Sequence, residues 1–105
     1  MSVSVTPASV TLQGSDVLAL AGVLDYRSGP GLREQGRRLI EGAAPDALVV
    51  DCSAVEKSSS VGLSLLLAFS RDAKARGKAL SVRALPEDLA QIAQVYGIGT
   101  LLNRS

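Results

Sequence analysis

The feature that most constrains the fold is a buried-strand pattern that runs directly into a helical one. Residues 47–50, Ala-Leu-Val-Val, form a continuous apolar run, which is typical of a strand covered on both faces. Residues 60–76 then repeat apolar side chains at helical spacing and end before Gly77, a residue suited to cap a helix C-terminus. A strand that leads into a helix of this length predicts an α/β fold.

Alternating residues precede this pair and extend the predicted sheet. Apolar and polar side chains alternate over 3–5 and again over 10–12, as in half-buried strands. A turn signal at 13–16 leads into an apolar strand over 17–24. A turn this short predicts that the strands on either side of it run antiparallel.

A helix is expected over residues 28–42. Leu32, Leu39 and Ile40 can share its buried face, and Gly36 leaves room for a close neighbour. Its other face interleaves basic and acidic side chains, namely Arg33, Arg37, Arg38, Glu34 and Glu41. Such a face is either solvated and joined by ion pairs along the helix, which we favour, or a site for an anion or a partner.

The last third of the chain adds one strand and one helix. Residues 79–84 form the strand, and Pro86 stands in the first turn of the helix that follows. The apolar stripe of this helix ends before Gly97 and consists of Leu89, Ile92, Ala93 and Tyr96. Residues 1–105 therefore predict a single α/β domain, a sandwich in which helices pack against one or both faces of a mixed β-sheet.

Composition excludes several classes of function. Lys plus Arg is 11 and Asp plus Glu is 10, a balance that argues against nucleic-acid binding through a broad cationic field. Histidine is absent and Cys52 is the single cysteine, so we expect no metal site and no cofactor. The chain shows no signal-peptide pattern and no apolar run of the ~20 residues that cross a bilayer. We therefore expect a cytoplasmic protein without direct membrane insertion.

Three consecutive serines, Ser58, Ser59 and Ser60, separate the central strand from the helix over 60–76. Ser58 or Ser59 is expected to be the helix N-cap, because a serine hydroxyl can accept a hydrogen bond from an unpaired N–H of the first turn. A cap requires one serine and leaves the others unexplained. Ser60 has no histidine to activate it and no G-x-S-x-G sequence around it, and Lys57 lies in a predicted loop, so we expect no enzyme.

The helix over 60–76 is apolar on more than one side. A helical wheel directs one set of residues toward the sheet, namely Gly62, Leu65, Leu66, Phe69 and Ala73. Leu63 and Leu67 lie off that side. Two leucines one turn apart, rimmed by serine and basic residues, form either additional packing within the domain or the docking surface that we favour. The expected partner-binding residues are Ser60, Leu63, Ser64 and Leu67 at the centre, with Lys57, Arg71 and Lys74 at the rim.

Two stretches, GVLDYRSGPGLREQG at 22–36 and ALVVDCSAVEKSSSVGLSLLLAFSRDAKARGKALSV at 47–82, resemble the STAS domain family. That family is shared by sulfate transporters and anti-sigma factor antagonists, and the resemblance covers nearly the whole chain. The family's signature is an Asp, a Ser or Thr, a small residue and a Gly that opens a helix. Here Gly62 fixes the register, Val61 is the small residue and Ser60 takes the hydroxyl position, whereas Ser59 stands where the aspartate is usual.

The resemblance implies one of two functions. VEKSSSVGLSLLL and the ending PEDLAQIAQVYGIGTLL are more similar to the MlaB branch, whose members are cytoplasmic subunits of a phospholipid ABC transporter. This implies a MlaF-like nucleotide-binding subunit as partner and a peripheral position at the inner membrane. In anti-sigma factor antagonists the hydroxyl is phosphorylated by a partner kinase, which would make Ser60 a phosphoacceptor here.

Two further alternatives stay open: the chain could carry a small ligand, and in isolation it could form a homodimer. Open α/β sheets tend to bind ligands at the carboxyl ends of their strands, and the helix N-terminus at Ser59 and Ser60 could hold an anion there. The chain would then be a carrier of a small ligand. Exposed leucines on one helix could also produce a homodimer when the natural partner is absent.

Overall fold

The computed structural model describes residues 8–95, which form a mixed four-stranded sheet and three helices. In chain order these are β1 (Ser9–Gln13), β2 (Val17–Leu24), α1 (Gly29–Gly42), β3 (Ala47–Ser58), α2 (Ser60–Ala75), β4 (Ala79–Arg83) and α3 (Glu87–Val95). The predicted α/β class and mixed sheet are confirmed. The strand predicted at 3–5, together with Tyr96, Gly97 and everything after them, lies outside the described residues.

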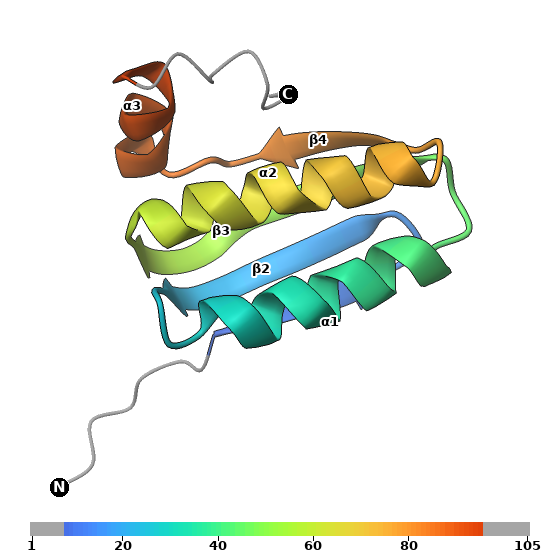
Figure 1. Ribbon diagram of the computed structural model, residues 1–105, viewed down its shortest axis with the longest axis horizontal. Helices are drawn as coiled ribbons and strands as arrows, with labels where there is room; N and C mark the ends of the chain where they lie inside the picture. The colour runs from blue at the N-terminus through green and yellow to red at the C-terminus, as the bar shows by residue number, and fades with distance from the viewer. Residues whose placement is uncertain (1–7, 96–105) are drawn as a thin grey trace, which may run out of the picture.

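The sheet has the strand order β1-β2-β3-β4. β1 and β2 form the predicted antiparallel hairpin, with Val10 opposite Leu20. β2, β3 and β4 run parallel to one another, so each parallel pair is joined by a helix, α1 and then α2. The carboxyl ends of β2 and β3 therefore meet at the edge of the sheet where both helices begin, and the three serines lie at that edge (Figure 1).

Both long helices lie side by side on one face of the sheet, and α3 stands beyond the end of β4 (Figure 1). Burial along β3 accordingly alternates. Leu48, Val50 and Cys52 are buried, whereas Val49 is half-buried and Ala47 is exposed. The prediction that β3 is covered on both faces is therefore wrong, because α1 and α2 cover the same face. Within residues 8–95 the other face of β3 carries Ala47 and Val49 and has no helix packed on it, so the apolar run does not indicate two covered faces.

The core lies between the sheet and the α1–α2 pair, and Phe69 of α2 is its largest fully buried side chain. A Cβ built on Gly36 of α1 would overlap the Phe69 ring, so the two helices approach closely only because residue 36 is glycine. Leu32 and Ile40 flank this contact and are buried, as predicted, while Leu39 is only partly buried. We call this contact between α1 and α2 the seam.

α2 ends before Gly77, which caps the helix C-terminus as predicted. Gly77 has φ +69, its N–H donates to the carbonyl of Lys74 at 3.0 Å, and the N–H of Lys78 donates to the carbonyl of Ala73 at 2.8 Å. This pair of bonds satisfies two carbonyls that the helix leaves unpaired. β4 ends one residue earlier than predicted, at Arg83, because Ala84 adopts φ 58 and turns the chain toward α3.

Candidate functional site

The N-terminus of α2 is capped by the second of the three serines. Ser59 has extended backbone angles, and its Oγ accepts a hydrogen bond from the N–H of Val61 at 3.2 Å. Ser58 does not cap the helix. Its hydroxyl donates to the Ser59 carbonyl at 2.7 Å and lies so close to Gly62 that a Cβ there would overlap it. The glycine of the signature thus makes room for the serine four residues before it.

The solvent side of α2 carries a ridge made of Ser60, Ser64, Leu67, Arg71 and Lys74. Ser60 is the first residue of the helix and is exposed, and within residues 8–95 its hydroxyl takes part in no hydrogen bond. The Ser64 hydroxyl donates to the Ser60 carbonyl at 3.4 Å. Leu67 is partly buried, while Arg71 and Lys74 are exposed beside it. The structure therefore brings five of the seven expected residues onto one surface.

Leu63 does not belong to this ridge, contrary to the expectation that it is exposed beside Leu67. It is 4% exposed and belongs to the core cluster. Leu89 and Ala93 of α3 belong to the same cluster, and α3 packs against α2. Leu63 is therefore buried within the domain, which leaves Leu67 as the one leucine of the predicted pair with surface to offer.

Lys57 also lies apart from the ridge. It is exposed at the end of β3 and lines a shallow hollow with Asp25, Ser58 and Ser59. The carboxylate of Asp25 accepts hydrogen bonds from the N–H groups of Arg27 and Ser28, at 2.9 and 3.1 Å. This hollow is the crevice at the carboxyl ends of the strands, and it is lined by one acidic and one basic side chain, Asp25 and Lys57.

An open groove that is not predicted from the sequence runs between the N-terminal halves of α1 and α2. Its lining is Tyr26, Gly29, Pro30, Arg33, Val61, Ser64, Leu65 and Ala68. Its volume is about 370 Å³. Tyr26, at the turn before α1, is 73% exposed. No local pattern around Tyr26 predicts the groove, because it exists only where two segments, 26–33 and 61–68, meet in the fold.

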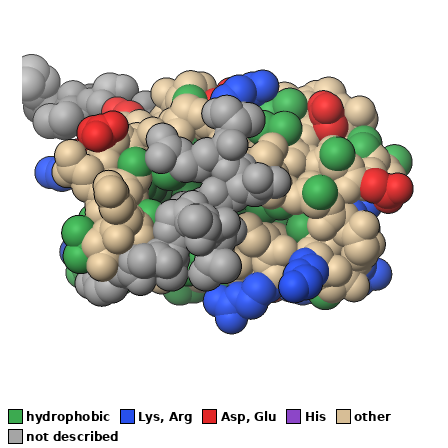
Figure 2. Space-filling model, turned by 90° about the horizontal axis from the view of Figure 1, so that it is seen from above, with side chains coloured by type: hydrophobic (Ala, Val, Ile, Leu, Met, Phe, Trp, Pro, Cys, Tyr) green, Lys and Arg blue, Asp and Glu red, His purple; other side chains and the backbone are tan. Residues whose placement is uncertain are grey.

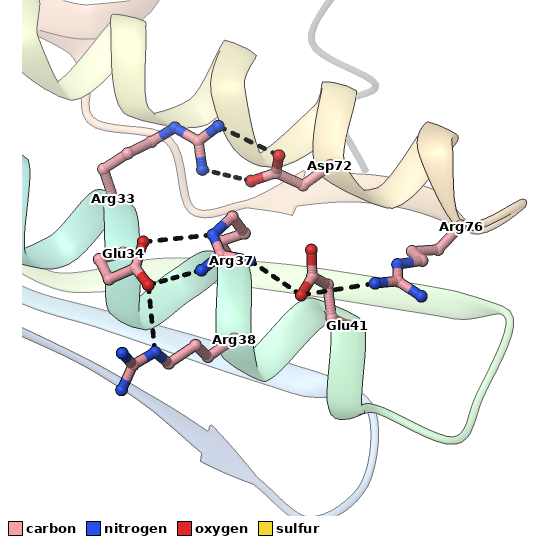
Figure 3. A network of polar contacts seen from close by, with 7 residues as sticks. All are labelled: Arg33, Glu34, Arg37, Arg38, Glu41, Asp72 and Arg76. Carbon is pink, nitrogen blue, oxygen red and sulfur yellow. Dashed lines mark hydrogen bonds and ion pairs between the residues drawn. The ribbon is translucent and has the colours of Figure 1, made fainter.

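The charged face of α1 is a network of ion pairs (Figure 3). Arg37 pairs with both Glu34 and Glu41, and Arg38 also reaches Glu34. The hydrogen bond from Arg37 is the largest cause that holds the pKa of Glu34 below its usual value. This is the solvated arrangement that we favoured for this face.

Two further pairs cross from α1 to α2 (Figure 3). Arg33 binds Asp72 through both guanidinium nitrogens, at 2.5 and 3.1 Å, and Arg76 lies 3.5 Å from the Glu41 carboxylate. Arg33 also lines the groove, so the Arg33–Asp72 pair stands at its C-terminal limit, and the Arg76–Glu41 pair lies further along the seam.

Three properties of the described residues concern metal binding, thiol reactivity and membrane crossing. Residues 8–95 contain no group of three or more His, Cys, Asp or Glu side chains placed to hold a metal ion. Burial raises the pKa of the Cys52 thiol to about 12, so this thiol is a poor nucleophile at neutral pH. None of the described helices is long and apolar enough to cross a membrane.

Comparison with known proteins gives a consistent match. The family model described as "Mlab, STAS domain" matches residues 8–103. An anti-sigma factor antagonist from Mycobacterium paratuberculosis is 25% identical, with a TM-score of 0.74 over 96% of this chain and 85% of that one.

Two less similar structures share the fold. The Bacillus cell fate determinant SpoIIAA in its phosphorylated form is 16% identical, with a TM-score of 0.67 over 94% of this chain and 91% of that one. A sulfate transporter family protein from Wolinella succinogenes is 14% identical, with a TM-score of 0.66 over 85% of this chain and 74% of that one.

Proposed function

The chain belongs to the STAS domain family, and from that membership we propose that it is the non-catalytic STAS subunit of an Mla-type ABC transporter. In this role it binds the MlaF-like nucleotide-binding subunit from the cytoplasmic side, and it supports the assembly and ATPase activity of the complex. The complex moves phospholipid and maintains the lipid asymmetry of the outer membrane. The match of residues 8–103 to the Mlab family model carries this proposal.

The ridge of α2 is the surface that we propose for this contact. Ser60 and Ser64 present exposed hydroxyls, and Leu67 offers partly exposed apolar area between them and the basic residues. Arg71 and Lys74 form no ion pair within residues 8–95 and so are free to meet acidic groups of a partner. A small apolar centre with a charged rim is the usual anatomy of a transient protein–protein interface.

A negative charge at Ser60 affects the fold and the interface in opposite ways. At the first residue of α2 it meets the favourable end of the helix dipole, worth about 0.3–1 kcal/mol. Buried against a partner, the same charge must lose its water, at a cost that reaches several kcal/mol. The interface term is larger, so a negative charge at this position should release the partner while leaving the domain folded.

We predict that Ser60→Glu weakens binding of the partner by about tenfold or more without loss of thermal stability. The tagged chain is used to capture its partner from its own cells, mass spectrometry identifies that partner, and binding of the purified pair is then measured. Ser15→Glu is the matched control, because Ser15 is an exposed serine in the β1–β2 turn at the opposite end of the sheet. Capture of an ABC-transporter ATPase by wild type and by Ser15→Glu, but not by Ser60→Glu, supports the proposal.

The alternative is an anti-sigma factor antagonist switched by phosphorylation of Ser60. The similarity to the antagonist from Mycobacterium paratuberculosis favours it, and the exposed Ser60 hydroxyl is open to a kinase. The same capture experiment separates the two functions. A kinase of a sigma-factor pathway in place of a transporter ATPase, together with phosphate on Ser60, would establish the alternative.

A further inference from the structure

The groove between α1 and α2 is apolar in lining and continuous with the ridge. Val61, Leu65 and Ala68 line it from α2, and Pro30 lines it from α1. Ser64 belongs to both the groove and the ridge, so a protein docked on the ridge also covers the groove. Since no described part of the chain fills this space, an apolar side chain could be buried in it at little cost in polar desolvation.

Tyr26 forms an oriented wall at the mouth of the groove. The Arg27 guanidinium lies over its ring, 5.7 Å from the centroid, and the Arg27 Nε donates to its hydroxyl at 3.3 Å. Tyrosine is among the residues most often found at the energetic centre of interfaces. A large aromatic side chain that is 73% exposed and already held in place by a neighbour loses little freedom when a partner covers it.

Charge around the groove is unbalanced toward positive. Arg27, next to Tyr26, and Arg71, one helical turn after Ala68, form no ion pair within residues 8–95, whereas the acidic groups of the seam, Asp72 among them, are already paired. Asp25, which precedes Tyr26, lines the separate hollow at the ends of β2 and β3 and not the groove. In Figure 2, Lys and Arg side chains project along the lower border, on the side of the helical layer.

We propose that the groove receives a single apolar side chain, of the size of leucine or phenylalanine, carried on an acidic segment of the partner. The proposal rests on the proposed function, in which that partner is the ATPase subunit. The apolar side chain packs against Tyr26, Val61 and Ala68, and acidic residues flanking it face the unpaired basic side chains. Complementary charge of this kind fixes the register of docking and speeds the encounter.

The test fills the groove with a larger side chain of the protein itself. In Ala68→Leu a larger side chain projects into the groove, whereas in Ala75→Leu the same change is made at an exposed position at the end of α2. With the purified chain and its captured ATPase subunit, Ala68→Leu and Tyr26→Ala should each weaken binding by about tenfold or more. Ala75→Leu should bind like wild type, and urea unfolding should show all three variants folded.

A second pair of variants tests the charge. Arg71→Gln and Arg38→Gln each remove one exposed arginine, but Arg38 lies on the outer face of α1, away from the groove. Arg71→Gln should weaken binding and flatten its dependence on salt concentration, while Arg38→Gln should do neither. Equal effects of the two variants on binding and on its salt dependence would overturn the proposal that the partner segment is acidic.

Each remaining outcome decides the proposal. Binding that is lost in Ser60→Glu but unchanged in Ala68→Leu and Tyr26→Ala keeps the proposed function and overturns the groove. A wild type that captures no ATPase subunit overturns both. If the chain alone sediments as a dimer that Ala68→Leu dissociates, the groove is occupied by a second copy and not by an acidic segment.

Discussion

The two ends of the seam between α1 and α2 differ in whether the chain itself fills and pairs them. At the C-terminal end Arg33 pairs with Asp72, and Glu41 lies between Arg37 and Arg76, so the charged groups that face each other across the seam are paired. At the N-terminal end the same two helices leave a groove of about 370 Å³ open beside Tyr26. Both ends belong to one contact between the same two helices.

The difference indicates which end is structural. Buried or half-buried polar groups in a stable fold are satisfied internally, as they are around Asp72, whose side chain is 14% exposed. A binding surface instead keeps apolar area and charge available for a partner. Gly36 meets Phe69 in the middle of the seam, and this close contact sets the distance between the two helices.

The largest expected effect is the loss of stability when the contact between Gly36 and Phe69 is disrupted. In Gly36→Ala the new methyl overlaps the fully buried Phe69 ring, so we expect a loss of about 1–3 kcal/mol in the free energy of unfolding. Gly31→Ala is the matched control on the same helix, because a Cβ there meets nothing within 4 Å. It should gain about 0.4–1 kcal/mol through the less flexible unfolded chain. Urea unfolding measures both, and equal stabilities would show that the seam is looser than described.

A smaller effect is expected at the closed end. Arg33→Gln, Asp72→Asn and the double variant form a cycle that isolates the coupling energy of this pair. With side chains 39% and 14% exposed, the coupling should be about 0.5–1 kcal/mol, since partial exposure to water weakens the attraction. A coupling above about 2 kcal/mol would mean that the ion pair, and not the packing of Phe69 on Gly36, holds the helices together.

Local patterns in the sequence were sufficient to predict most of the fold. The hairpin, the α/β alternation and the capping glycine at 77 follow from spacing and residue type alone, and the structure confirms each of them. The coverage of β3 was predicted wrongly, because a run of apolar residues does not reveal which face a helix covers. That information is held in how α1 and α2 pack, which involves residues distant in sequence.

The site was less predictable for the same reason. A helical wheel of α2 correctly places Ser60, Ser64 and Arg71 toward solvent, because that depends on one helix. It cannot show that α3 packs against α2 and that Leu63 is buried in the shared cluster. The groove beside Tyr26 requires two helices and a turn, so only the assembled fold reveals it.

The smallest expected effect is a response to acid in the ion-pair network along α1. The hydrogen bond from Arg37 lowers the pKa of Glu34 in the folded protein below the unfolded value of about 4.3. Folding therefore favours the ionised form of this carboxyl group. Its stabilisation is fully present above that unfolded pKa and is lost as pH falls through the lower, folded pKa. An NMR titration of the Glu34 carboxyl should show the lowered pKa in wild type and in Tyr26→Ala, and a return toward the ordinary value in Arg37→Gln. An ordinary pKa in wild type would mean that the network is not formed in solution, and the contrast between the two ends would then rest on packing alone.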